Sequence, residues 1–173
     1  MLAEKYAARI DQIFSKYPTK RSAVMPLLHL AQEEFGYVNE EAIQQVAVLC
    51  DMDPTQVQSI AGFYTMYSER PKGKYWLQVC TDLACALRGA DKFHKELKEH
   101  LGVEEGGTTE DGLFTVEHVM CLAACDKAPM LQCNFHFEEN LDMDKMKARI
   151  EAWRAEAAAE KSGAKKASAK TKA

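Results

Sequence analysis

The sequence predicts an α+β chain in which an N-terminal helical bundle is followed by a small α/β sandwich. Two observations support this fold class. Apolar residues recur with the 3.6-residue period of helices through residues 1–67, and after the turn at Pro71-Lys72-Gly73-Lys74 the period changes to the two-residue alternation of strands. The later segments follow in the order strand, helix, strand, strand, helix, which suits one sheet covered by helices.

Four helices are expected in the first part. The first carries one apolar stripe and is broken at Pro18, and the second covers about 21–35, where Gly36 supplies a left-handed stop. Asn39 can cap a third helix, whose first turn is acidic. The Asp-Pro pair at 53–54 places a cap directly before a proline, so a short fourth helix is expected to begin there.

The second part is expected to form a sandwich of thioredoxin-like type. Its predicted elements are a strand over 75–79, a helix over about 85–101, a strand over 114–119, two short strands forming a hairpin within 128–137, and a last helix over about 142–159. The first strand leads directly into Cys80 and the second into Cys121. Because ligand sites of α/β sheets lie at the edge where such strands end, both cysteines mark a candidate site.

The bulk composition fits a soluble globular protein. Hydrophobic residues make up 47 % of the 173 residues and charged residues 28 %, so a packed core is expected without disulfide staples. No stretch approaches the roughly 18 apolar residues of a membrane span, and the first residues lack the apolar segment of a secretory signal. We therefore expect a cytoplasmic, bacterial protein without direct membrane insertion, whose six cysteines are reduced.

Three regions follow from these patterns: a helical domain at 1–70, an α/β domain at 71–158 and an Ala/Lys-rich tail at 159–173. Residues 156–173 carry a net charge of +3, so the other 155 residues carry −7 of the total of −4. An acidic body argues against nucleic-acid binding. The composition of the tail predicts a disordered end.

Four of the six cysteines form two close pairs. Four residues separate Cys80 from Cys85, and three residues separate Cys121 from Cys125, with 35 residues between the pairs. Thiolate is a soft ligand, and four thiolates select zinc or an iron–sulfur cluster over hard cations. The sequence therefore predicts a metal centre held by these four residues, whereas Cys50 and Cys133 are interpreted as core thiols.

Several kinds of cysteine site compete for this pattern. Structural zinc tolerates spacers of two to four residues, but it commonly uses tight C-x2-C knuckles in domains that lack a core. A thioredoxin-type redox site needs C-x-x-C, which neither pair has, and a Rieske centre needs two histidines in place of two cysteines. A [2Fe–2S] cluster takes two thiolates on each iron, which two separate pairs can supply. The spacing thus favours an iron–sulfur cluster, with a zinc-stabilised interaction module as the alternative from a different class.

Longer motifs around the cysteines carry a family resemblance. The segments C80-TDLA-C85, GGTTEDGLFTVEHVMC at 106–121 and C121-LAA-C125-DKAP resemble the E subunits of NADH-quinone oxidoreductases. This family is the thioredoxin-like [2Fe–2S] ferredoxin subunit of respiratory complex I. The segments SAVMPLLHLAQEEFGYV at 22–38 and QSIAGFYTMYSERPKGKYWLQVC at 58–80 are also similar to it, so the resemblance covers about residues 5–150.

The resemblance implies a function in electron transport. It implies one [2Fe–2S] cluster bound by Cys80, Cys85, Cys121 and Cys125, no catalytic residue on this chain, and two partners: a flavoprotein subunit that binds FMN and NADH, and an iron–sulfur subunit of the same complex. The chain has no G-x-G-x-x-G motif after a strand, so we do not expect it to bind NADH itself. Related subunits of NAD-dependent formate dehydrogenases and hydrogenases are the alternative within the same class.

Further residues are candidates for tuning or docking. Arg88 follows Cys85 by one helical turn, where a cation would favour the reduced cluster, unless it is a surface residue paired with a carboxylate. Met120 precedes Cys121 where the family more often has a polar residue. The aromatic cluster Phe63, Tyr64 and Tyr67 is interpreted as core packing or as a docking surface for the flavoprotein.

Overall fold

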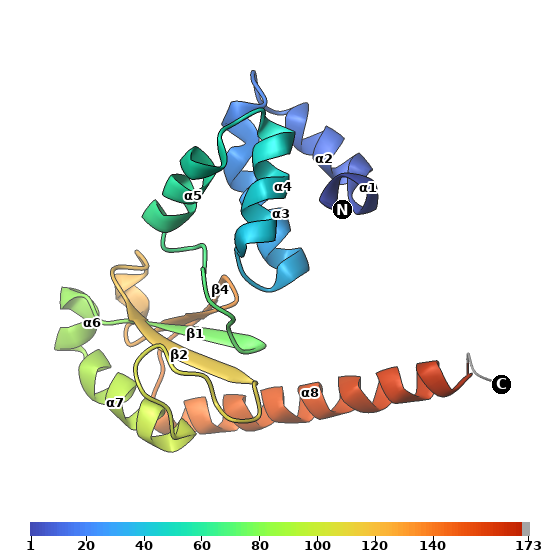
Figure 1. Cartoon of the computed structure of the whole chain (residues 1–173). Coiled ribbons are helices and arrows are strands. Elements are labelled where there is room, and N and C mark those ends of the chain that lie inside the picture. Colours follow the sequence, from blue (N-terminus) through green and yellow to red (C-terminus); the bar gives the residue numbers. More distant parts are fainter. Residues whose placement is uncertain (171–173) are drawn as a thin grey trace. The chain divides into compact units, whose positions relative to one another are not determined.

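The chain forms two compact units, Met1–Lys72 and Gly73–Ala173, in a computed structural model (Figure 1). The structure describes the backbone of residues 1–170 and the side chains of residues 1–160. Each unit is described by itself below. In the described part of the chain no helix is long and apolar enough to cross a bilayer.

The first unit consists of helices, as the sequence predicts. Its elements are α1 (Leu2–Lys5), α2 (Ala7–Phe14), the 3₁₀ helix η1 (Arg21–Ala23), α3 (Val24–Phe35), α4 (Glu40–Cys50) and α5 (Pro54–Phe63). The predicted first helix is divided at Tyr6, whose φ of −121° is not helical. The Tyr6 hydroxyl donates a hydrogen bond to Glu34 at 2.7 Å, which ties this break to α3.

The helix boundaries in this unit follow the predicted signals. Gly36 ends α3 with a φ of 79°, and the Asn39 side chain accepts a hydrogen bond from the Ala42 N–H at 2.8 Å. Tyr67 belongs to the core, because it is buried and its hydroxyl donates to the Met25 carbonyl at 2.8 Å. Phe63, in contrast, is exposed at the end of α5.

The second unit is built on a four-stranded sheet. The strands are β1 (Tyr75–Cys80), β2 (Phe114–Val119), β3 (Leu131–Cys133) and β4 (His136–Glu138), in the order β2-β1-β3-β4 (Figure 1). β1 pairs in parallel with β2, whereas β3 is antiparallel to both β1 and β4. All six residues of β1 are buried, so this central strand is covered on both faces and does not alternate between core and solvent.

Helices α6 (Leu83–Leu87), α7 (Ala90–Leu101) and α8 (Met143–Lys170) and the 3₁₀ helix η2 (Cys125–Lys127) complete the unit. The single helix predicted over 85–101 is wrong, because the chain breaks at Gly89, which has a φ of 90° and precedes α7. This break separates Leu87 from the apolar stripe of α7, and Leu87 is exposed.

The core of this unit lies between the sheet and the helices α7 and α8. Leu77 of β1 and Phe114 of β2 are fully buried in one apolar cluster with Leu97 of α7 and Ile150 of α8. Tyr75 stacks on Trp153 of α8 with ring centroids 5.1 Å apart. This packing fixes β1 and β2 in position, and the two cysteine pairs follow directly from their ends.

Helix α8 extends beyond the end that the sequence predicts. It continues to Lys170, whereas the apolar periodicity ends near residue 159. Side chains after residue 160 and all of 171–173 lie outside the described residues. The disordered tail expected at 159–173 therefore stays a prediction.

Candidate metal centre

Parallel pairing brings the starts of the two cysteine pairs to one edge of the sheet. Cys80 is the last residue of β1 and lies opposite Val119, the last residue of β2, in the β1–β2 register. The Thr81 N–H continues the pairing by donating to the Val119 carbonyl at 3.2 Å. Cys121 follows two residues after β2. The two strands thus deliver one thiol of each pair to the same place.

A short helix folds the first pair together. The Asp82 carboxylate caps α6 by accepting the Leu83 N–H at 2.8 Å, and this turn returns Cys85 toward Cys80. Cys80 is 2 % exposed and Cys85 is 1 % exposed. Both lie in an apolar cluster with Met130, whose carbonyl accepts the Cys80 N–H at 3.2 Å. The first pair is therefore the inner half of the site.

The second pair lies in a tight loop at the surface. Ala123, between the two cysteines, has a left-handed φ of 61°, and its N–H donates to the Cys121 Sγ at 3.3 Å. Cys125 is the first residue of η2. Both thiols of this pair are exposed. A backbone N–H aimed at sulfur stabilises the thiolate form, which is the form that binds metal.

The four thiols are close enough to affect one another. Burial raises the pKa of Cys85 to about 12, with further contributions from a hydrogen bond with Cys80 and from the charges of Cys125 and Cys121. Hydrogen bonding with Cys121 raises the pKa of Cys125, and the Asp82 carboxylate adds to this effect. Both thiols therefore hold their protons at neutral pH without a metal, and metal binding would release them.

This donor set fits a [2Fe–2S] cluster. The site consists of a buried pair and an exposed pair of thiols, which the parallel strands bring to one sheet edge. A [2Fe–2S] cluster takes two thiolates on each of two irons, so two pairs supply its ligand count. The assignment of Cys80, Cys85, Cys121 and Cys125 as ligands is carried forward as a proposal.

The two other cysteines are separate from this site. Cys50 is buried at the end of α4 in the helical unit, and burial raises its pKa to about 11. Cys133 is buried in β3, within the apolar cluster that contains Leu77, and burial raises its pKa to about 12. Neither thiol belongs to the apolar cluster around Cys80 and Cys85.

Two histidines of the second unit lie against one carboxylate. His94 Nε2 lies 3.1 Å from one Glu105 carboxylate oxygen, and His118 Nδ1 lies 2.9 Å from the other. Burial lowers the pKa of His94. Arg88 has an exposed side chain, and its N–H donates to the Cys85 carbonyl at 3.0 Å at the end of α6.

Two residues near the thiols were not singled out from the sequence. Asp82 carries a readable signal, because an aspartate directly before a helix is a typical N-cap. Ala123 could not be identified from the sequence. Alanine rarely adopts a left-handed conformation, so nothing in the residue type predicts its φ of 61° or the hydrogen bond from its N–H to Cys121.

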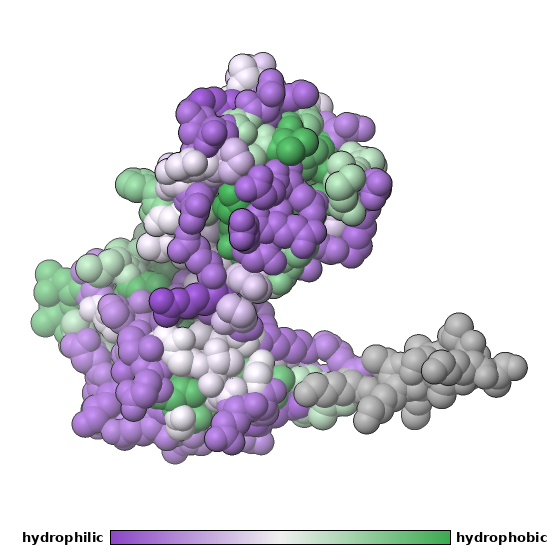
Figure 2. Space-filling view, in the orientation of Figure 1, coloured by the Kyte–Doolittle hydropathy of each residue, from purple (hydrophilic) through white to green (hydrophobic). Residues whose placement is uncertain are grey.

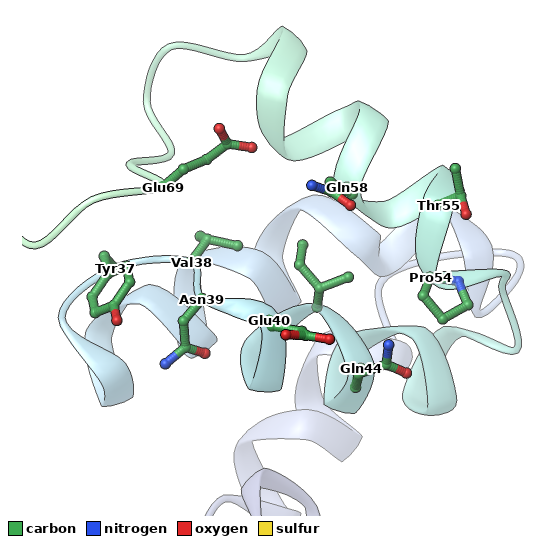
Figure 3. A pocket seen from close by; sticks show the side chains of 10 residues that line it. Tyr37, Val38, Asn39, Glu40, Gln44, Pro54, Thr55, Gln58 and Glu69 are labelled. Atoms are coloured by element: carbon green, nitrogen blue, oxygen red, sulfur yellow. The ribbon is translucent and has the colours of Figure 1, made fainter.

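A cavity of about 660 Å³ in the helical unit is not part of this centre (Figure 3). The segment from Tyr37 to Glu40, the helix α5 and Glu69 contribute side chains around it, and none of its lining residues is a cysteine or histidine. It therefore offers no soft metal ligand.

Comparison with protein families supports an iron–sulfur assignment. Residues 10–154 match the family model described as thioredoxin-like [2Fe–2S] ferredoxin. The E subunit of the NADH-quinone oxidoreductase of Rickettsia bellii is 40 % identical over 154 residues, which cover 87 % of this chain and 92 % of the relative. NADH-quinone oxidoreductase subunit 2 of Thermus thermophilus is 44 % identical over 127 residues, covering 72 % and 70 %.

Longer relatives and solved structures extend this comparison. The corresponding E subunit of Mycobacterium tuberculosis is 39 % identical over 145 residues, which cover 84 % of this chain but only 58 % of that relative. A crystal structure of an NAD⁺-reducing [NiFe]-hydrogenase in the air-oxidised state shares the fold with a TM-score of 0.65. At 20 % identity, over 75 % of this chain and 23 % of that one, this likeness concerns the fold alone.

Proposed function

Because the chain belongs to the thioredoxin-like [2Fe–2S] ferredoxin family, among the E subunits of NADH-quinone oxidoreductases, we propose that it is the one-electron carrier beside an FMN- and NADH-binding flavoprotein subunit. The observation that carries this proposal is the convergence of two thiol pairs at one sheet edge. Cys80 ends β1, and Cys121 follows the end of its parallel neighbour β2. A [2Fe–2S] cluster, when bound, supplies one-electron transfer at a potential set by its surroundings.

The residues of this chain would give the centre an inner and an outer half. Cys80 and Cys85 are buried beside Met130, where apolar packing excludes water from their sulfurs. Cys121 and Cys125 are exposed and so give electrons a short route to the surface. The Ala123 N–H supports the outer half by donating to Cys121. Burial of one pair and exposure of the other suits a carrier that exchanges electrons without reacting with a substrate.

The chain would work as part of an oxidoreductase. The nucleotide and flavin sites belong to the flavoprotein in this proposal, because the chain lacks a G-x-G-x-x-G motif after a strand. A second iron–sulfur subunit would receive electrons from the same flavoprotein. The proposed location is the cytoplasmic, peripheral arm of the complex. The domain division proposed for this function is a helical domain at 1–70 and a cluster domain at 71–158.

An equivalent role in an NAD-linked hydrogenase or formate dehydrogenase is the second candidate. The shared fold with the hydrogenase chain favours it, although fold alone does not establish activity. The choice of flavoprotein separates the candidates, because each complex has its own flavoprotein subunit.

The proposal is tested by mixing the purified chain with the FMN-binding subunit of the NADH-quinone oxidoreductase under anaerobic conditions. Addition of NADH should then bleach the visible absorption of this chain with one electron taken up per chain. The same addition without the flavoprotein should leave its spectrum unchanged. Bleaching by NADH alone, or no bleaching with flavoprotein that NADH has reduced, would contradict the proposed role.

A further inference from the structure

Two carboxylates and two side-chain amides line the cavity of about 660 Å³ in the helical unit (Figure 3). Glu40 contributes from the first turn of α4, and Glu69 contributes from the segment after α5. Gln44 of α4 and Gln58 of α5 lie around the same cavity. Within residues 1–160, whose side chains the structure describes, these four side chains make no hydrogen bond or ion pair. Water solvates them in the free protein, so a ligand can take the place of that water.

The two glutamates have no cationic partner within residues 1–160. None of the residues that line the cavity is a lysine, an arginine or a histidine. Arg70 follows Glu69 directly in the sequence, but it does not line the cavity and makes no ion pair in the described part of the chain. Arg21 donates to a glutamine of α5 at 3.3 Å and does not line the cavity either. Glu33 and Glu34 of the same unit, in contrast, each pair with a basic side chain.

Apolar side chains line the same cavity. Val38 and Ile43 are 4 % and 7 % exposed, so the core of the unit holds them in place. Tyr37 and Pro54 are half-buried and add apolar surface. A lysine or arginine side chain suits such a site, because its aliphatic stem packs on apolar surface while its charged head donates to carboxylates.

The site is longer than one side chain. A second cavity of about 520 Å³ is lined by Asn39, Glu40, Glu41 and Gln44, three of which also line the first. The two cavities therefore adjoin along the N-terminal half of α4, and Glu41 adds a third carboxylate. We call the two cavities together the acidic trough. Its length fits an extended segment with more than one basic residue better than it fits a single amine.

We propose that the acidic trough binds an extended, lysine- or arginine-bearing segment of a partner protein. Basic side chains of that segment would donate to Glu40 and Glu69, and its backbone would bond to the amides of Gln44 and Gln58. The face of the helical unit drawn in Figure 2 is mainly hydrophilic, with small hydrophobic areas, so polar recognition suits this unit. Every residue of the trough belongs to the unit Met1–Lys72, so the proposal does not depend on the metal centre.

The test titrates the peptide acetyl-Lys-Ala-Ala-Arg-amide into the isotope-labelled full chain and follows the side-chain amides by two-dimensional NMR. The trough variant combines Glu40→Gln with Glu69→Gln. The matched control combines Asp11→Asn with Asp51→Asn, which removes the same charge from two exposed residues of the same unit that do not line the trough. Glu69→Gln alone is tested as well, because Glu69 lies outside any helix and its substitution leaves the first turn of α4 intact.

The peptide should shift the side-chain amide signals of Gln44 and Gln58. The trough variant should raise the Kd about fivefold or more and Glu69→Gln alone by a smaller factor, whereas the control should change it by less than about twofold. Equal weakening in the trough variant and the control would mean that net charge alone attracts the peptide, and this result or unshifted amides would overturn the trough. Spermidine that displaces the peptide at the same concentration would also overturn the proposal, because the site would then take a small polyamine.

Discussion

The N–H of Ala123 donates a hydrogen bond to the Sγ of Cys121 at 3.3 Å, and Ala123 reaches this position with a left-handed φ of 61°. Left-handed backbone costs a residue with a side chain about 1 kcal/mol or more, and such strain gathers at functional sites. The loop between the outer thiols is therefore shaped around a hydrogen bond to sulfur.

Ala123→Val should weaken this loop. A β-branched residue fits a φ near 60° poorly, so we expect a loss of about 1–3 kcal/mol in the stability of the loop and faster loss of the metal centre. Ala123→Gly is the matched control, because glycine adopts this φ and keeps the N–H donor. The measurement is the rate at which a chelator bleaches the visible absorption. Equal rates in the two variants would show that the conformation of Ala123 does not matter.

Asp82→Asn should raise the midpoint potential of the centre. The Asp82 carboxylate accepts a hydrogen bond from the Leu83 N–H, and its negative charge contributes to the raised pKa of Cys125. The same negative charge opposes the addition of an electron to the metal centre. Asparagine keeps the cap acceptor but removes the charge. We expect a positive shift of roughly 20–40 mV, which corresponds to about 0.5–1 kcal/mol for one electron.

Asp144→Asn, in the first turn of α8, is the control for this prediction. This substitution removes one negative charge from the same unit, at a residue that does not contact the thiols. An EPR-monitored redox titration gives each potential. A shift of the same size in both variants would mean that only net charge matters.

Cys50→Ala and Cys133→Ala should both keep the metal centre. Both thiols are buried in apolar clusters that do not include Cys80 or Cys85, so their removal should affect only stability, by about 1 kcal/mol. Cys85→Ala is the comparison and should lose the bound iron. Iron analysis of the three variants checks the assignment. Loss of iron in Cys133→Ala would give that thiol a role that its position does not suggest.

The ionised Glu105 side chain should stabilise the second unit above about pH 4.5. Partial burial opposes its ionisation, but hydrogen bonds from the His118 N–H, the His118 ring and Lys98 outweigh burial and hold its pKa at about 2. Because the folded-state pKa lies below the ordinary value of 4.5, this stabilisation is lost as the pH falls toward 2. The effect should be under about 1 kcal/mol, since solvent screens this carboxylate.

Thermal unfolding of Glu105→Gln against Glu110→Gln measures this contribution. Glu110 is an exposed residue of the same loop and serves as the control. We expect Glu105→Gln to lower the Tm at pH 6, by a smaller amount near pH 3, and to match the wild type only near pH 2, where the folded protein also protonates Glu105. A difference that persists at low pH would show that the charge of Glu105 is not the cause.

The positions of the strands and of the paired thiols could be predicted from the sequence. Each cysteine pair begins at or just after the end of an apolar segment that reads as a strand. Because β1 and β2 pair in parallel, their ends lie at the same edge of the sheet, and so do the two cysteine pairs. The caps of α4 and α5 were also readable, because Asn39 and Asp53 accept hydrogen bonds where their chemistry predicts.

The break between α6 and α7 could not be predicted from periodicity. Leu87, Phe93 and Leu97 are apolar residues of the segment predicted as one helix, and a glycine within a helix costs only about 1 kcal/mol, so Gly89 did not mark a helix end. In the structure α6 ends at Leu87, two residues after Cys85. Gly89 then adopts a φ of 90° directly before α7 begins. The segment therefore forms two helices, although its apolar residues and its single glycine are compatible with one helix.

The most direct test of the central claim is the EPR spectrum of the anaerobically purified chain before and after dithionite, with iron, zinc and sulfide analysis of the same sample. The account predicts about two irons and two sulfides per chain, no signal when oxidised, and one paramagnetic centre when reduced. A colourless, EPR-silent protein with one zinc per chain would contradict it and assign the four thiols to a structural metal site.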